Sequence, residues 1–346
     1  MTSPEIPSKV IASVSAAIAE ALAPAPPPPS PSPPRGGPKG GPLLPRSLPP
    51  IRLPTSSTLA VQMLMPMAPW DWPTATIGSI PYAQFVLSDA VPASAVPGVA
   101  YEPTGASFSG NYTMFLNLLA ARQFPAPAVL DAALAMTAQP PSTPTMMTAP
   151  DGWVASPDSA GITRWRPAYG VNLTPAAWLT QVAASKGSEV TLTLPINDEK
   201  ALAVTDPAGQ TSVLSLAGEA DYAQITAAAL AQVTVTPGRW FQDALLRLGR
   251  NGPWLPGLAP GAPYGGMLSA RVSGLIVAYN PVLRIVGPDP VHSVTGAALS
   301  AAQSVQIAGF TFPAPVQQQD TATPAPVYGA RSAGTWIVGV TVEAFP

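Results

Sequence analysis

The sequence contains no cysteine and few charged residues. Without cysteine the chain can form neither a disulfide nor a thiolate metal site, and it has no cysteine nucleophile. Charged residues make up 10% of the 346 residues, against about 25% in a typical soluble domain. Small and neutral polar residues must cover such a surface, and they protect it weakly against association. We therefore expect a protein that associates with itself or is covered by partners.

The charges that are present nearly cancel. The net charge is −2 at pH 7, so the chain has no basic field that would attract nucleic acid. No apolar run approaches the roughly 20 residues that a transmembrane helix needs. The N-terminus also makes a poor signal peptide, because only Lys9 is basic before an apolar stretch that Ser13, Ser15 and Glu20 interrupt. These features favour a cytoplasmic protein, or one exported by a bacterium without a conventional signal peptide.

The first 56 residues divide into two segments. Within residues 1–23, residues 7 to 22 carry apolar positions at helical spacing and predict a short amphipathic helix, which would either dock on a partner or pack on its own domain. Residues 24–56 hold fourteen prolines, which exclude a persistent helix or central strand and predict a disordered linker. The apolar positions of the helix are Val10, Ile11, Val14, Ile18 and Leu22.

Residues 57–346 predict a globular α+β body. A first strand is expected near Leu59–Met65, and an apolar run follows at Ile80–Leu87. Helices are predicted over residues 112–122 and 128–136, and the proline-rich residues 140–150 mark a possible sub-boundary. The residues expected to face the core on the two helices are Leu116, Leu119 and Ala120, and then Val129, Ala133 and Leu134.

The C-terminal half is mostly β, with antiparallel, sandwich-like sheets and a few short helices as the predicted architecture. Alternating apolar residues indicate strands near 190–195, 222–235, 305–312 and 335–344. On the last strand, even-numbered residues from Trp336 to Val342 are expected on one face. Two hairpins are predicted, one around residues 206–210 and one around Asn280-Pro281, and a short helix at residues 239–248 is expected to end at Gly249.

No catalytic centre is recognisable. His292 is the one histidine. Asp289, His292 and Ser293 do not predict a hydrolase triad, because adjacent residues of an extended chain point to different sides and the sequence has no G-x-S-x-G nucleophile turn. The sequence has no phosphate-binding glycine loop and no set of metal ligands, so no cofactor and no metal are predicted. Six acids fall between residues 189 and 221, and a carboxylate-dependent hydrolase would need two of them in one cleft: Glu189, Asp198, Glu199, Asp206, Glu219 and Asp221.

Aromatic residues in proline-flanked loops are the remaining candidates for a binding site. Trp70, Trp72, Trp254 and Tyr264 lie in such loops, and rings exposed there can stack on sugars or anchor a protein partner. The triplet Arg164-Trp165-Arg166 also combines a large ring with polar groups.

The leading hypothesis is a non-enzymatic structural or interaction protein that self-associates, with its N-terminal arm as tether or docking segment. A carbohydrate-binding or toxin-like surface protein is the first alternative, and a carboxylate-dependent hydrolase is the second.

Overall fold

The structure of this chain is a computed structural model. It describes residues 12, 15, 16, 18, 59–70, 82–122, 124, 126–138, 140, 151–184, 189–194, 202–251, 267–289, 291–307, 310–318 and 325–345. These residues form mostly β structure in several antiparallel sheets, with six short helices, as the composition and periodicity predicted. Residues 24–56, the predicted linker, lie outside the described residues.

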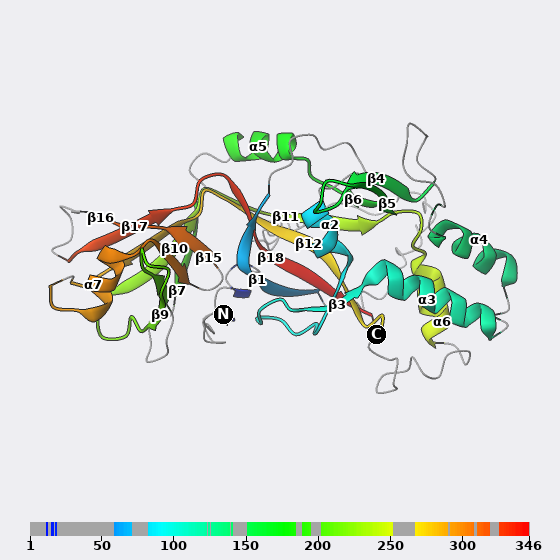
Figure 1. The fold of residues 1–346 in the computed structure, drawn as a ribbon, viewed down its shortest axis with the longest axis horizontal. Helices are drawn as coiled ribbons and strands as arrows, with labels where there is room; N and C mark the ends of the chain where they lie inside the picture. The colour runs from blue at the N-terminus through cyan, green and yellow to red at the C-terminus, as the bar shows by residue number, and fades with distance from the viewer. Residues whose placement is uncertain are drawn as a thin grey trace, which may run out of the picture.

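The molecule contains two five-stranded sheets, the first in the middle of Figure 1 and the second toward its left end. The first has the order β1-β18-β12-β11-β6 and the second the order β16-β17-β13-β10-β7. Their strands are β1 (Leu59–Pro69), β6 (Tyr169–Val171), β7 (Val190–Leu194), β10 (Tyr222–Ala227), β11 (Ala229–Pro237), β12 (Ala270–Tyr279), β13 (Val282–Val286), β16 (Val316–Gln318), β17 (Val327–Arg331) and β18 (Thr335–Ala344).

The two sheets are joined by three pairs of consecutive strands. β10 leads into β11, β12 into β13 and β17 into β18. The order β17-β13-β10 in the second sheet therefore matches the order β18-β12-β11 in the first. The two sheets are therefore one long antiparallel sheet that bends where each pair joins.

The bend at Asn280-Pro281 corrects a prediction. The sequence indicated a hairpin there, but β12 pairs with β11 and β18, whereas β13 pairs with β10 and β17. Asn280 adopts a φ of 47°, its backbone N–H donates to Gly334 O at 2.8 Å, and its Oδ1 accepts from Gly334 N at 2.7 Å. Asn tolerates this left-handed conformation, so the chain turns into the second sheet instead of folding back.

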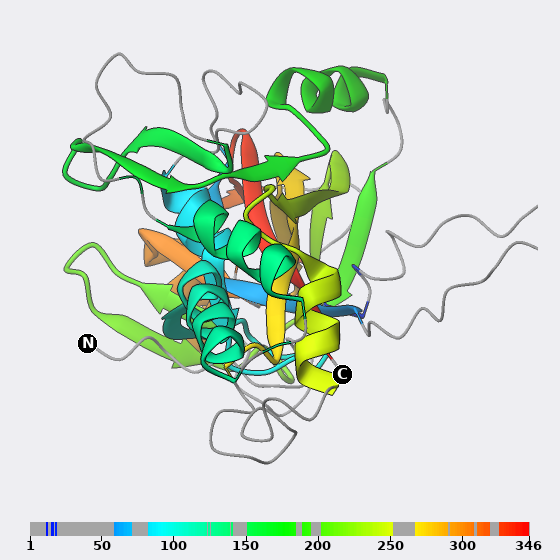
Figure 2. The ribbon, with the colours of Figure 1, turned by 90° about the vertical axis from the view of Figure 1, so that its right-hand side faces the viewer.

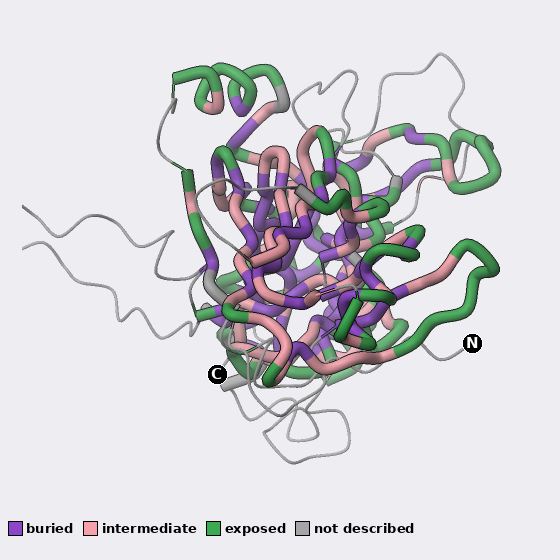
Figure 3. Tube along the Cα trace, turned by 90° about the vertical axis from the view of Figure 1, so that its left-hand side faces the viewer, coloured by how far each residue is buried: buried purple, intermediate pink, exposed green. Residues whose placement is uncertain are grey.

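A four-stranded sheet covers one face of the second sheet. Its order is β15-β14-β8-β9, and the predicted hairpin at residues 206–210 is confirmed between β8 and β9. Apolar side chains between the two layers, such as Ile225, Ile285 and Val305, are buried, and the interior strands are purple in Figure 3. The strands are β8 (Leu202–Thr205), β9 (Thr211–Leu214), β14 (Ser304–Ile307) and β15 (Phe310–Pro313).

Five of the described helices and two small hairpins lie around the first sheet, whereas α7 packs beside the second sheet (Figure 1). Figure 2 shows α3, α4 and α6 together at the end of the molecule away from the second sheet. The helices are α2 (Tyr82–Asp89), α3 (Phe108–Ala121), α4 (Pro127–Thr137), α5 (Pro175–Ala184), α6 (Asp243–Asn251) and α7 (Val294–Ala301). The hairpins are β2 (Ala90–Pro92) with β3 (Pro103–Ser107), and β4 (Trp153–Pro157) with β5 (Thr163–Pro167).

The helices confirm two predicted segments and correct some details. Leu116, Leu119 and Ala133 are buried as expected, but Ala120 and Val129 are exposed. α6 begins later than predicted and continues past Gly249 to Asn251. A Cβ on Gly249 would collide with the Phe115 ring of α3, so this glycine permits close helix packing and does not end the helix.

The last strand departs from strict alternation. Val338 lies in the core around the second sheet, whereas Val340 and Val342 lie in the core under the helices. The pairing register with β12 shifts between Ile276 and Val277, and this irregularity is a β-bulge that moves later side chains to the opposite face. The expectation of one face for Trp336 to Val342 was therefore wrong beyond Val338.

Candidate functional site

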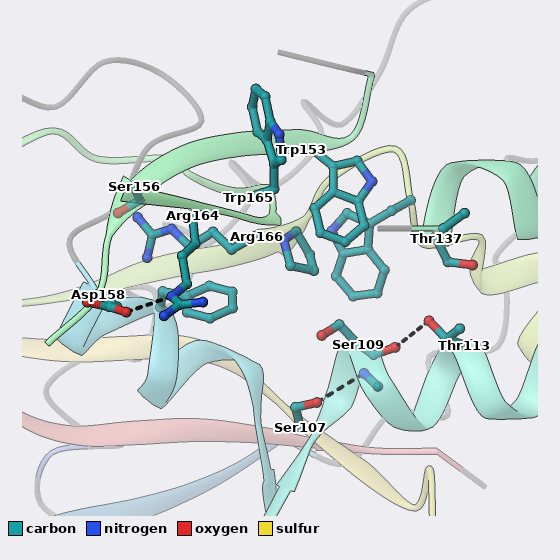
Figure 4. Close-up of a pocket in the computed structure, with 15 residues that line it drawn as sticks. Ser107, Ser109, Thr113, Thr137, Trp153, Ser156, Asp158, Arg164, Trp165 and Arg166 are labelled. Carbon is teal, nitrogen blue, oxygen red and sulfur yellow. Dashed lines mark hydrogen bonds and ion pairs between the residues drawn. The ribbon is translucent and has the colours of Figure 1, made fainter. Parts of the chain in front are cut away.

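A cleft of about 720 Å³ lies between the β4–β5 hairpin, the N-terminal end of α3 and the C-terminal end of α4 (Figure 4). Its volume is in the range typical of small-molecule sites, roughly 300–1,000 Å³. Polar side chains line it together with Phe85 of α2, Trp153 of β4 and Trp240.

Two arginines of β5 reach the cleft from the same face of the strand. Arg164 and Arg166 alternate with Trp165, and successive side chains of a strand point to opposite faces. Figure 4 shows the two arginines near Asp158 and Trp165 on the other side of the strand. The hairpin thus brings two guanidinium groups to one wall of the cleft.

The turn of this hairpin fixes the position of Asp158. Its Oδ1 accepts from Ala160 N at 2.9 Å and from Ile162 N at 3.0 Å. Its Oδ2 accepts from Arg164 Nε at 2.8 Å. The hydrogen bond from Arg164 and the backbone donors hold the pKa of this carboxyl below its usual range, so Asp158 is ionised at neutral pH.

Arg166 lies deeper than Arg164. Its residue is 6% exposed, whereas the side chain of Arg164 is 65% exposed. The Arg166 guanidinium carbon stands 4.8 Å from the centroid of the Phe85 ring, which is the geometry of a cation–π contact. The inner arginine is therefore held against an aromatic face and the outer one is open to solvent.

The start of α3 forms the opposite wall. The Oγ of Ser107 accepts from Gly110 N at 3.1 Å and caps the helix. Behind it, the buried carboxylate of Asp89 accepts from Ser109 N at 2.8 Å, from Ser109 Oγ at 2.7 Å and from Tyr169 OH at 2.6 Å. Burial raises the pKa of Asp89, although these three hydrogen bonds oppose the shift.

Of the three tryptophans that line the cleft, Trp153 and Trp240 have their indole N–H groups engaged, whereas Trp165 Nε1 is buried and has no hydrogen-bond partner among the described residues. Trp153 Nε1 donates to Met136 O at 3.0 Å, and Trp240 Nε1 donates to Ala168 O at 2.7 Å. These two rings offer apolar surface to a ligand. The Ser109 and Thr113 hydroxyls donate to Asp89 Oδ2 and Ser109 O, so recognition of an anion falls to the arginines. Among the described residues, Arg164, Arg166 and Asp158 are the charged side chains that line the cleft.

Of the tryptophan and tyrosine candidates, Trp70 is the one that the structure describes, and it does not line this cleft. Trp70 is 4% exposed and packs edge to face on Trp178 of α5, with ring centroids 6.4 Å apart. It presents no free ring to a sugar, so it does not support the carbohydrate alternative. Trp72, Trp254 and Tyr264 lie outside the described residues.

Of the predicted docking helix, Ile18 is helical and fully buried in the body of its own chain. Val10, Ile11, Val14 and Leu22 lie outside the described residues.

The four described members of the acid cluster do not line the cleft either. Asp206 accepts from Gln210 N at 2.8 Å in the β8–β9 turn, and Glu219 accepts from Ser293 Oγ at 2.6 Å at the start of α7. Glu189 and Asp221 are exposed, and Asp198 and Glu199 lie outside the described residues. His292 is exposed beside α7, at the end of the molecule opposite α4 (Figure 1). Thus no two of the described acids in this cluster share the cleft.

Sequence reasoning noticed the Arg164-Trp165-Arg166 triplet as an aromatic cluster and missed the arginine pair as a site. Alternation along a strand is the signal that would have placed both arginines on one face. Within the described part of the chain, no cluster of three or more residues suited to a metal ion occurs, and no helix is long and apolar enough to cross a membrane.

Comparison with protein-family models, curated proteins and solved structures finds no match to this chain.

Proposed function

We propose that this protein is a non-enzymatic interaction protein whose cleft binds a ligand with a carboxylate or phosphate group beside an apolar or aromatic part. The observation that carries the proposal is the pair Arg164 and Arg166 on one face of β5, in a chain with few charges elsewhere. Guanidinium groups bind carboxylate and phosphate through two parallel hydrogen bonds, which gives orientation as well as affinity.

Arg164 can change partners at small cost. Its ion pair with Asp158 is solvent-exposed, and such pairs contribute only about 0–1 kcal/mol. An anionic ligand group can therefore replace Asp158, while Arg166 contributes its charge from the buried end of the cleft. Phe85 and Trp153 then face the apolar part of the ligand.

The cleft acids support binding over catalysis. The lowered pKa of Asp158 makes it a poor proton donor at neutral pH, and Asp89 is buried behind Ser109 with all three of its contacts to donors of the fold. Asp89 does not line the cleft, and Asp158, which does, has its oxygens occupied by two backbone N–H groups and by Arg164.

Ligand-observed NMR titrations with benzoate, phenyl phosphate and uncharged benzyl alcohol test this proposal. We expect the two anions to bind with dissociation constants on the order of 1 mM, as suits fragments of this size, and benzyl alcohol to bind at least tenfold more weakly. Arg164→Gln is expected to weaken the anions about tenfold, which corresponds to about 1.4 kcal/mol.

Arg247→Gln is the matched control. Arg247 is also exposed and ion-paired, with Asp243 at 2.6 Å, but it does not line the cleft. It should leave binding unchanged. Equal binding of the alcohol and the anions, or equal effects of the two substitutions, would contradict the proposal.

A further inference from the structure

A short helical segment near the N-terminus is inserted into the body. Ser15 and Ile18 are buried and helical, at 2% and 0% exposure, whereas Ala12 and Ala16 are exposed. Residues three apart lie on one face of a helix, so one face of this segment points into the protein and another into solvent. Ile18 belongs to the same apolar cluster as Met63 and Met67 of β1.

The body is shaped for this segment at Gly98. Gly98 has a φ of +76°, and its N–H donates to Val61 O at 3.0 Å along the edge of β1. A Cβ on Gly98 would lie 3.2 Å from the Cα of Ala12, so the helix backbone passes close to the glycine. We call the surface formed by Gly98 and by the cluster around Met63 and Met67 the helix seat.

The fit in the seat is apolar and imperfect. The Ser15 hydroxyl is buried without a hydrogen-bond partner among the described residues, and this loss of hydration opposes docking. Burial of the Ile18 side chain favours docking. Because one buried group opposes the contact, the segment can leave the seat.

The residues that connect the N-terminal segment to β1 are numerous enough to allow exchange of the segment between copies of the protein. Forty residues, 19–58, separate Ile18 from β1 in the sequence. A linker of that length and of the predicted disordered character would give the segment an effective concentration at its own seat on the order of millimolar. A second copy competes for the seat only when its own concentration approaches that value.

We propose that the helix seat is a docking site for the N-terminal segment of this protein, filled by its own chain at low concentration and by a second copy at high local concentration. This surface is separate from the arginine cleft, so it does not depend on the function proposed for that cleft. Exchange of the segment would link copies into assemblies, which is the behaviour that the low surface charge predicts.

A labelled peptide of residues 1–23 tests the seat in the full-length chain. Ile18→Asp places a charge where a fully buried apolar side chain stood, so this variant should vacate its own seat. By fluorescence anisotropy, we expect the peptide to bind this variant at least tenfold more tightly than it binds the unchanged protein. Sedimentation of the unchanged protein should show mass above the monomer near 1 mM, and the Ile18→Asp protein should remain monomeric.

Two peptide variants distinguish binding at the helix seat from nonspecific binding. A peptide with Ile18→Asp should bind neither protein, whereas a peptide with Ala16→Asp should bind like the natural one because Ala16 is exposed. Should the Ile18→Asp protein fail to fold, Ile18→Ala replaces it. This smaller change should weaken docking of the protein's own segment, and the peptide should again bind the variant more tightly than the unchanged protein. No binding to a folded, vacated protein, or equal binding to both proteins, would overturn the proposal.

Discussion

Replacing Asp89 by alanine removes the acceptor of three hydrogen bonds at the base of the cleft. Tyr169 is 1% exposed, so its hydroxyl cannot turn to water, whereas Ser109 lines the cleft and can be rehydrated. An orphaned buried hydroxyl costs about 1–3 kcal/mol, and hydrogen bonds to a charged group contribute about 1.5–3 kcal/mol each. Removal of a buried charge offsets part of this loss. We expect Asp89→Ala to lower the free energy of unfolding by about 3 kcal/mol in urea titrations.

Asp89→Asn is the matched variant. Its amide oxygen can accept from Ser109 N and Tyr169 OH, and its amide nitrogen can donate to Ser109 Oγ, so the three contacts remain. It differs from the natural residue in having no titratable proton. At neutral pH this variant should be at least as stable as the unchanged protein.

The difference in free energy of unfolding between Asp89→Asn and the unchanged protein should increase with pH. Burial raises the pKa of Asp89 above its ordinary value of 3.8, so the folded state binds the proton more tightly than the unfolded state. The contribution of this group to stability is then complete below pH 3.8 and is lost as the pH rises through the folded pKa. The free energy of unfolding of Asp89→Asn, relative to the unchanged protein, should therefore grow over that interval and become constant above it. A difference that is flat or shrinks with rising pH, or an alanine variant as stable as the asparagine variant, would refute this reasoning.

Two further substitutions test packing and capping. Gly249→Ala should lower the free energy of unfolding by about 1–3 kcal/mol, because its Cβ meets the Phe115 ring, whereas Gly170→Ala, whose nearest neighbour is 3.9 Å away, should change it by much less in the same urea titration. Ser293→Ala removes the cap that accepts from Gly296 N at 2.9 Å and should cost about 1 kcal/mol. Hydrogen bonds from Ser293 and Thr295 lower the pKa of Glu219, so the stabilisation from Glu219 is present above pH 4.5 and is lost as the pH falls through the folded pKa. Ser293→Ala should therefore flatten stability–pH curves on the acid side, and an unchanged curve would contradict this assignment.

Local pattern was enough to predict most elements and was not enough to predict their pairing. The last strand occupies residues 335–344 as its alternation indicated, and the turn at residues 206–210 joins two paired strands. Asn280-Pro281 carries a similar local signal but lies between two sheets, because partners far along the chain satisfy both strands. Turn chemistry does not report which strands will be neighbours.

The cleft was harder still to predict because it assembles side chains from distant elements. Phe85, Ser109 and Arg166 come from different helices and strands, and no local spacing connects them. The prolines that flank Trp70 left open whether its ring is exposed or buried, because its packing on Trp178 depends on the position of α5. In both cases tertiary contacts decide what the sequence leaves open.

The three strand pairs that run from one sheet into the other also bear on how the protein unfolds. Each pair contributes side chains to both apolar clusters. Unfolding of the strands in one cluster therefore disrupts the packing of the other. Separate domains open independently, whereas a shared set of strands couples opening at both ends. The central amides of β12 and β13 should consequently exchange with deuterium at one common, slow rate, as a single cooperative unit.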